Sequence, residues 1–149
     1  MYNDKRLGKK NMVNILVIDA QGGGLGKQLI SSIKEEIEDV KIIAVGTNSV
    51  ATSAMLKAGA DIAATGENCV VVNAPRADII VGPIGIVIAN AMYGEVTPTM
   101  ATAIASSPAK KVFIPYNQYE IYIVGVEENS IRNLVVEAIK KLKELVQAR

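Results

Sequence analysis

A glycine-rich segment separates the first apolar run of the chain from its first helical pattern. The run at residues 13–19 is almost continuously apolar and rich in β-branched side chains, which is typical of a strand buried on both faces. After the glycines, Leu25, Leu29 and Ile33 recur at helical spacing. A strand, a glycine turn and a helix in this order are typical of the first unit of an open parallel sheet, and few other folds accommodate them.

The same alternation continues along the chain. Further apolar runs predict strands at 40–45, 60–65, 78–81 and 111–116. Helical patterns cover residues 49–57, 97–106 and 131–145. Residues 67–73 favour a strand by propensity, because Cys69 is followed by three valines. Parallel strands need a crossover between them, however, so we predict a helix there.

The end of the fifth strand carries a hairpin signal. Asn117 and Gln118 predict a tight turn, and residues 120–126 predict a sixth strand, antiparallel to the fifth. The expected fold is therefore a three-layer Rossmann-like α/β domain, with a mainly parallel sheet of about five strands plus an antiparallel edge hairpin. We expect residues 1–11, which are polar and unpatterned, to be a disordered leader, and residues 12–149 to form a single domain.

Composition excludes several functional classes. The chain has no histidine, which removes the usual neutral-pH base and most transition-metal sites, and we expect no metal. Its single cysteine, Cys69, fits a reducing cytoplasm and reads as a small buried residue rather than a nucleophile. Basic residues gather at the two ends and leave the middle acidic, so we expect no nucleic-acid partner. No apolar run is long enough for a membrane span.

The glycine-rich loop is the strongest candidate for a binding site. Glycines let the backbone approach a ligand, and the N-terminus of the following helix favours an anion. Ligands of open parallel sheets bind at the carboxyl ends of the strands, where this loop lies. The candidate residues of the loop are Asp19, Gln21, Gly22, Gly23, Gly24, Gly26 and Lys27. The alternative is that the glycines only make a tight turn with close packing.

The loop departs from the two well-known phosphate-binding patterns. In the dinucleotide fingerprint G-x-G-x-x-G, Gly22 and Gly24 supply the first two glycines, but Lys27 occupies the third position. The acidic residue expected after the second strand is replaced by Gly46-Thr47-Asn48. The ATPase loop requires a glycine where Gln21 stands and a hydroxyl where Gln28 stands, so nucleotide hydrolysis is not expected.

Other strand ends at the same edge add candidates. We expect Thr47 and Asn48, with Gly82 and Pro83 after the fourth strand, to border the site, and Tyr116 with Asn117 to offer hydrogen bonds. The arm at 84–95 has two interpretations. Its Asn90, Tyr93 and Glu95 reach into the cleft, or its apolar stretch at 84–91 is the contact surface of a homo-oligomer, which we favour. The acid/base candidates are Asp19, Lys27, Asp78 and Glu95, although Asp78 begins a strand and reads as a cap or surface group.

Three blocks of the chain resemble a family of small, uncharacterised bacterial proteins. The blocks are DAQGGGLGK at 19–27, ADIIVGPIGI at 77–86 and FIPYN at 113–117. The resemblance covers nearly the whole chain from Met12 onward. The family is known as a domain of unknown function with a Rossmann-like fold, so the resemblance implies that fold and no particular activity, cofactor or catalytic residue.

The leading functional hypothesis is a small-molecule-binding protein that recognises a phosphorylated or nucleotide ligand at residues 22–27. Lys27 and the loop amides are expected to hold the phosphate, Asn48 to touch a ribose hydroxyl, and Asp19 or Gln21 to set the orientation of the ligand. One alternative is an enzyme on the same site, either a nucleotide-cofactor oxidoreductase or a phosphate-ester enzyme that uses Asp19 and Lys27. The other is a non-catalytic subunit that oligomerises or docks a partner through its apolar arm.

Overall fold

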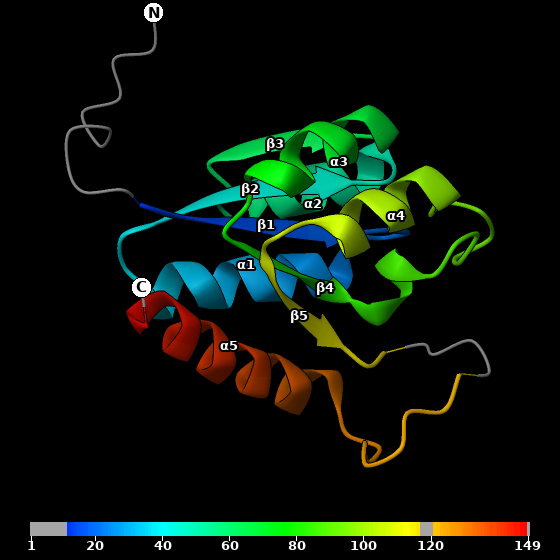
Figure 1. Ribbon diagram of the computed structural model, residues 1–149. Helices are drawn as coiled ribbons and strands as arrows, with labels where there is room; N and C mark the ends of the chain where they lie inside the picture. The colour runs from blue at the N-terminus through cyan, green and yellow to red at the C-terminus, as the bar shows by residue number, and fades with distance from the viewer. Residues whose placement is uncertain (1–11, 117–120, 149) are drawn as a thin grey trace, which may run out of the picture.

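The computed structural model describes residues 12–116 and 121–148 and shows five parallel strands in the order β3-β2-β1-β4-β5 (Figure 1). The strands are β1 Val13–Asp19, β2 Val40–Gly46, β3 Ile62–Thr65, β4 Ile79–Pro83 and β5 Lys110–Ile114. The helices are α1 Gly24–Glu36, α2 Ser49–Lys57, α3 Glu67–Asn73, α4 Pro98–Ser106 and α5 Ile131–Gln147. Short 3₁₀ segments at Ala74–Arg76 and Ile84–Val87 flank β4. The predicted Rossmann-like α/β fold is confirmed.

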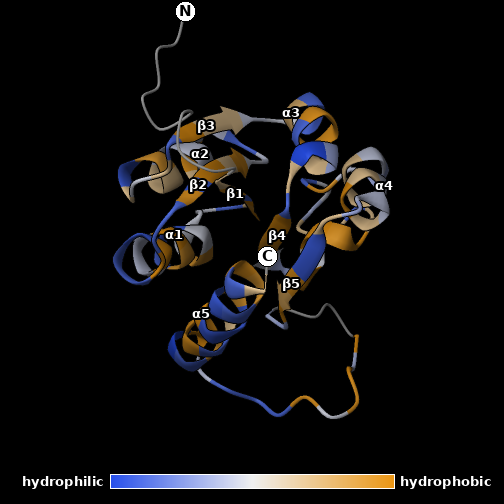
Figure 2. Ribbon diagram, turned by 60° about the vertical axis from the view of Figure 1, so that its left-hand side comes forward, coloured by the Kyte–Doolittle hydropathy of each residue, from blue (hydrophilic) through white to orange (hydrophobic). Residues whose placement is uncertain are grey.

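The helices form layers on both faces of the sheet (Figure 2). Alternate residues of β1 point to opposite faces, so Ile15 and Val17 pack with α1, α2 and α5, whereas Leu16 and Ile18 pack with α3 and α4. Both sets of side chains are fully buried, which explains why β1 reads as a continuous apolar run rather than as an alternating one.

The strand order reverses direction between β1 and β4. From β1 the chain moves outward to β2 and β3, then crosses back to place β4 on the other side of β1 and β5 beyond it. Ile15, Leu16 and Val17 of β1 pair with Ile79, Ile80 and Val81 of β4. The loop after β1 and the segment after β4 therefore border the crevice where open sheets of this kind bind their ligands.

Residues 67–73 form α3, so the helix predicted against β propensity is confirmed. The helix begins after Gly66, which has a positive φ of 103°. Val70 is completely buried against the α3–α4 side of the sheet. The crossover between β3 and β4 decides the structure here, because the connection must span one face of the sheet.

The antiparallel edge hairpin is absent, so that prediction is wrong. In residues 12–116 and 121–148 every strand is parallel, β5 ends at Ile114, and residues 121–126 form no strand. Gly125 has a φ of 86°, and the Val126 amide donates to the carbonyl of Ile123 in a turn. Strand propensity does not form a strand unless packing supports it, and Val124 is 99% exposed. The turn predicted at Asn117 and Gln118 and the leader predicted at 1–11 lie outside the described residues.

The arm at 84–95 is irregular and packs onto its own domain. It starts with the 3₁₀ segment and continues in turns in which Asn90, Met92 and Tyr93 have positive φ. Ile86 is completely buried, and Ala91 and Met92 are nearly so, in the apolar cluster beneath α4. Part of the hydrophobicity of this arm is therefore used within the chain itself, and the expectation that the arm forms an oligomer contact stays a prediction.

Candidate functional site

The chain turns sharply between β1 and α1. Gln21 has a φ of 52° and Gly23, the residue before the helix, has a φ of 74°. A Cβ on Gly23 would lie 2.8 Å from the Cα of Ala51 in α2. Glycine is therefore required at position 23 for both its backbone conformation and its close packing.

Gly26 is required for a different reason. A Cβ there would lie 2.6 Å from the Sδ of Met55 and 2.9 Å from the Cβ of Asp19, so α1 packs directly onto β1 and α2 at this point. Close helix–strand packing is the role of the third glycine in the dinucleotide fingerprint. The structure therefore corrects the alignment from the sequence: Gln21, Gly23 and Gly26 occupy the three fingerprint positions, one residue earlier than expected.

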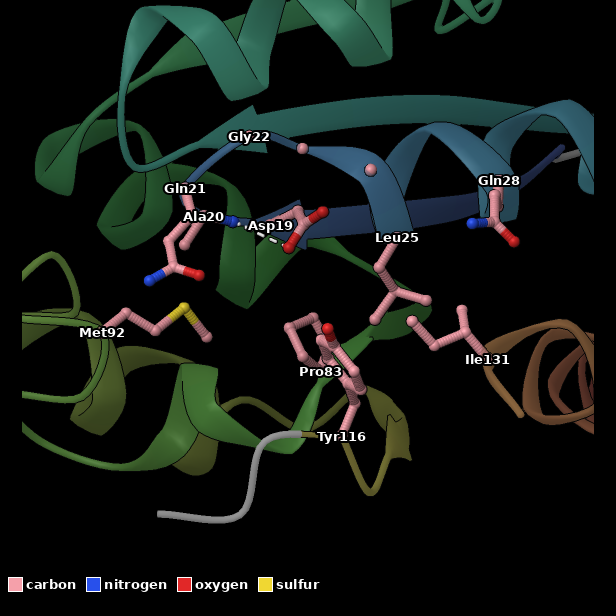
Figure 3. Close-up of a pocket in the computed structure, with 12 residues that line it drawn as sticks. Asp19, Ala20, Gln21, Gly22, Leu25, Gln28, Pro83, Met92, Tyr116 and Ile131 are labelled. Carbon is pink, nitrogen blue, oxygen red and sulfur yellow. Dashed lines mark hydrogen bonds between the residues drawn. The ribbon is translucent and has the colours of Figure 1, made fainter. Parts of the chain in front are cut away.

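Gly22 and Gly24 have no such constraint. Neither has a positive φ, and a Cβ on either would meet no atom within 4 Å. Both glycines line a cavity of about 240 Å³ at the carboxyl end of the sheet (Figure 3). The backbone amides of Gly22, Gly24 and Leu25 donate no hydrogen bond within the described part of the chain. The loop thus presents bare backbone and free amides to an open space.

The cavity lies at the crevice between β1 and β4. Its walls come from the loop, the first turns of α1, the end of β4, the 84–95 arm and the start of α5 (Figure 3). The lining residues are Asp19, Ala20, Gln21, Gly22, Gly23, Gly24, Leu25, Gln28, Pro83, Met92, Tyr116 and Ile131. No lysine or arginine is among them. Leu25, Met92, Pro83 and Ile131 give it apolar walls, while Gln21, Gln28 and Tyr116 supply neutral polar groups.

Asp19 lies at the base of the cavity and caps the start of α1. Its Oδ1 accepts from the Ala20 amide at 2.8 Å, and its Oδ2 accepts from the Gly26 amide at 2.7 Å. Only 5% of the residue is exposed. Burial raises the pKa of the Asp19 carboxyl above its ordinary value, against the lowering effect of the two amides, and the nearby charge of Glu95 adds to the rise. Both oxygens are thus engaged in holding the loop.

Glu95 reaches from the arm to the other side of the loop. Its Oε1 accepts hydrogen bonds from the Gln21 amide at 2.9 Å, the Thr47 hydroxyl at 2.7 Å and the Asn48 side-chain amide at 2.7 Å. Thr47 and Asn48 are accordingly held against Glu95 and do not line the cavity. Asn48 also caps α2 by accepting from the Ala51 amide. Glu95, anticipated to reach into the cleft, instead joins the loop after β1 to the end of β2.

The carboxylate of Glu95 makes the stability of the protein pH-dependent. Burial tends to raise the pKa of Glu95, but the hydrogen bonds from Gln21, Thr47 and Asn48 outweigh it and hold the pKa below its ordinary value. A depressed pKa means that the unfolded chain binds the proton more tightly, so the stability from Glu95 is present above the unfolded pKa and lost as the pH falls through the folded one. The raised pKa of Asp19 has the opposite effect, because the folded chain then binds the proton more tightly and the contribution of Asp19 to stability increases as the pH falls.

We therefore expect Glu95→Gln to flatten the acid limb of the stability profile. Urea unfolding from about pH 6 to about pH 3.5 should show wild type losing free energy of unfolding faster than the variant. Glu95→Ala leaves the three donors without their acceptor. It should lower that free energy by about 1–2 kcal/mol at neutral pH, because hydrogen bonds to water replace only part of the stabilisation from the three hydrogen bonds to Glu95. An identical acid slope in wild type and Glu95→Gln would contradict this account.

Lys27 is not part of the cavity. It lies on the α2 side of α1 in a separate open hollow, together with Ser49, Ser53 and Lys57. Beside Leu25, α1 turns Gln28 into the cavity, and Gln28 was not predicted as a binding residue from the sequence. One step along a helix rotates the side chain by about 100°. The spacing from Gly24 to Gln28, one helical turn, is the signal that would have found it.

The end of β4 contributes two candidates with different roles. Gly82 is buried, and a Cβ there would run into the carbonyl oxygen of Ile18 in β1. It is therefore a packing residue. Pro83 lines the cavity beside Tyr116. Two candidates of the arm, Asn90 and Tyr93, are exposed and lie outside this cavity. Asp78 lies at the opposite end of the sheet, where its carboxylate accepts a hydrogen bond from the Asn14 amide, as expected of a cap.

The described residues, 12–116 and 121–148, contain neither a metal-binding cluster nor a membrane-spanning helix. These residues contain no group of three or more histidine, cysteine, aspartate or glutamate side chains that could hold a metal ion. In the same residues, no helix has both the length and the apolar character needed to cross a membrane. The free Cys69 of α3 is half-buried, and its thiol donates a hydrogen bond to the carbonyl of Thr65 at the end of β3. It does not line the cavity.

Comparison with known proteins identifies the family. The model of the family described as "Domain of unknown function (DUF3842)" matches residues 14–147, which is nearly the whole chain. The chain belongs to this family, as the three sequence blocks indicated. No curated protein matches the chain.

Proposed function

We propose that this member of the DUF3842 family is a small-molecule-binding protein that holds a phosphorylated ligand of the nucleotide class in the cavity between β1 and β4. The observation that carries the proposal is the pair Gly22 and Gly24. Neither backbone conformation nor packing requires glycine at these positions, yet both line the cavity. A missing side chain that the fold does not need is explained by a ligand that lies against the backbone.

The free amides define what that ligand presents to the loop. Gly24 and Leu25 are the first two residues of α1, where unpaired N–H groups and the helix dipole favour negative charge. The third amide, that of Gly26, is already bound to Asp19. The loop therefore offers two helix amides, with that of Gly22 beside them, to the oxygens of an anionic group.

The charge of the cavity narrows the ligand class. No cationic side chain of the described residues lines it, and the carboxyl group of Asp19 lies at its base. A free phosphate dianion is poorly matched to such a site, because backbone dipoles alone would have to balance its charge next to a carboxylate. A diphosphate ester spreads one negative charge over each phosphate group, and the corresponding fingerprint loop holds it with amides rather than with lysine. We therefore favour a nucleoside diphosphate ester or a dinucleotide.

The remaining walls suit the uncharged part of such a ligand. Leu25, Pro83, Met92 and Ile131 surround the space with apolar groups on which a ring can pack. The side chains of Gln28 and Tyr116 offer hydrogen bonds to hydroxyl or ring nitrogen atoms. The loop amides alone thus take the phosphate-holding role first assigned to Lys27, and Gln28 with Tyr116 takes the hydroxyl-binding role first assigned to Asn48.

A phosphate-ester enzyme that uses Asp19 and Lys27 has less support. The two residues line different hollows, and both Asp19 oxygens are engaged by backbone amides. Two side chains that act together on one substrate must lie within reach of the same bond, and these two do not share a cavity. The nucleotide ligand is therefore proposed as a bound effector or cofactor. We also propose a reducing, cytoplasmic setting, because Cys69 is unpaired.

Ligand-induced stabilisation tests the proposal. Thermal unfolding should be recorded with a panel of nucleoside diphosphates, dinucleotides and sugar phosphates. A ligand that binds the folded state at a hundred times its Kd should raise the free energy of unfolding by about 2.7 kcal/mol. We expect at least one diphosphate ester to do so, and Lys27→Ala to respond as the wild type does, because Lys27 faces the other hollow. No shift across the panel, or a shift abolished by Lys27→Ala, would contradict the proposal.

A further inference from the structure

Residues 121–126 form an apolar segment that pairs with no strand among the described residues. Tyr122 is 90% exposed and Val124 is 99% exposed, and Ile121 and Val126 are also exposed. Figure 2 shows the segment running clear of the body of the domain before the chain returns to α5. Its sequence, Ile-Tyr-Ile-Val-Gly-Val, has the composition of a strand. Exposed apolar surface of this kind is typical of an interaction site.

The outer edge of β5 is open as well. Within the described residues, β5 pairs with β4 alone. The Lys110 amide donates to the carbonyl of Asp78 toward β4, so the next residue, Lys111, and with it Phe113, direct their backbone groups outward. An unpaired edge of this kind is a template for a strand from another chain.

The charges of the edge and of the segment are complementary. β5 begins with Lys110 and Lys111, and residues 121–126 are followed by Glu127 and Glu128. Laid antiparallel, with Lys110 opposite Glu128, the two stretches place Lys111 opposite Glu127 and Ile114 opposite Val124. Phe113 then lies opposite Gly125, a pairing in which an aromatic ring covers the glycine. Opposite charges and apolar pairs across strands each stabilise a sheet.

We propose that two copies of this chain form a two-fold dimer in which residues 121–128 of each copy add an antiparallel strand to the β5 edge of the other. The exchange is reciprocal, so both exposed segments and both open edges are covered at once. Within one chain the segment turns away from β5, with Gly125 at positive φ. The proposal does not depend on the ligand, and it assigns the oligomer contact to this segment rather than to the 84–95 arm.

Analytical ultracentrifugation of the full chain over a range of concentrations tests the dimer. Wild type should sediment with twice the chain mass, and Val124→Asp should weaken the dimer at least 100-fold. Because Val124 is almost fully exposed in the monomer, the substitution leaves the fold intact. The matched control is Val50→Asp, which puts the same charge on an exposed valine of α2 and should leave the dimer unchanged.

Charge reversal tests the pairing itself. Lys110→Glu and Glu128→Lys should each weaken the dimer roughly 5-fold, and the double variant should restore it, because the two side chains face each other across the new strand pair. A monomer at every concentration would overturn the proposal, as would a dimer that persists in Val124→Asp. Loss of the dimer in both single charge variants without rescue in the double variant would overturn the antiparallel alignment.

Discussion

Gly24→Ala is expected to remove ligand binding while leaving the protein as stable as before or slightly more so. A Cβ at position 24 meets no protein atom within 4 Å and the backbone is already helical, so alanine fits without strain. Such a replacement stabilises by about 0.4–1 kcal/mol through the unfolded state. The same methyl group occupies the space over the free amides, and the loss of two charge-assisted hydrogen bonds weakens binding by about 3 kcal/mol, or over 100-fold in Kd.

Calorimetric titration with the diphosphate ester found by thermal unfolding measures the effect on binding, and urea unfolding measures stability. Gly22→Ala should behave in the same way, because its Cβ also points into open space beside the cavity. Gln28→Ala, on the cavity wall, should weaken binding to a smaller extent, since it removes one neutral hydrogen bond. A Gly24→Ala variant that binds with unchanged affinity would show that the bare backbone is not the ligand contact.

Gly82→Ala should have the largest effect on stability of any glycine replacement in the site. A Cβ there runs into the main-chain oxygen of Ile18 in β1 and lies 3.0 Å from the Cδ1 of Ile86. Because β1 is the central strand of the sheet and β4 is paired on both sides, neither backbone can move without disturbing the core on both faces. We expect the free energy of unfolding to fall by about 3 kcal/mol or more.

Gly26→Ala provides a graded comparison for Gly82→Ala. Its Cβ meets side-chain atoms, the Sδ of Met55 and the Cβ of Asp19, rather than the main chain of a central strand, so the loss should be smaller, about 1–2 kcal/mol. Urea unfolding should therefore rank the three variants with Gly24→Ala most stable, Gly26→Ala intermediate and Gly82→Ala least stable. Equal stability of Gly24→Ala and Gly82→Ala would mean that β1 and β4 approach each other less closely than the structure indicates.

Much of the fold follows from patterns that are local in the chain. The continuous apolar run of β1 and the helical spacing of Leu25, Leu29 and Ile33 set the type of each element, because side-chain spacing decides which face of an element is buried. The helix at 67–73 was also predictable, since parallel strands require a crossover. From the parallel order alone, the loop after β1 could be placed at the carboxyl edge of the sheet.

The composition of the candidate site was only partly predictable. Of the predicted residues, Asp19, Gln21, Gly22, Gly23, Gly24 and Pro83 line the cavity, whereas Gly26 is packed against α2 and does not. Lys27 does not, because the cavity lies on the β4 side of α1 while Lys27 faces α2. The sequence contains the helical rotation that separates Lys27 from Gln28, but not the side of the helix on which the ligand space opens.

The sequence by itself determined the α/β alternation, the position of the glycine loop and the family of the chain. Only the tertiary structure decided which glycines serve packing and which face open space, since this depends on Ala51, Met55 and Ile18, residues of other elements. It also brought Glu95 onto the amide of Gln21, across 74 positions of sequence, and left residues 121–126 without a strand partner. Local spacing governs the conformation of each element, whereas contacts between distant residues are set by how the elements pack against one another.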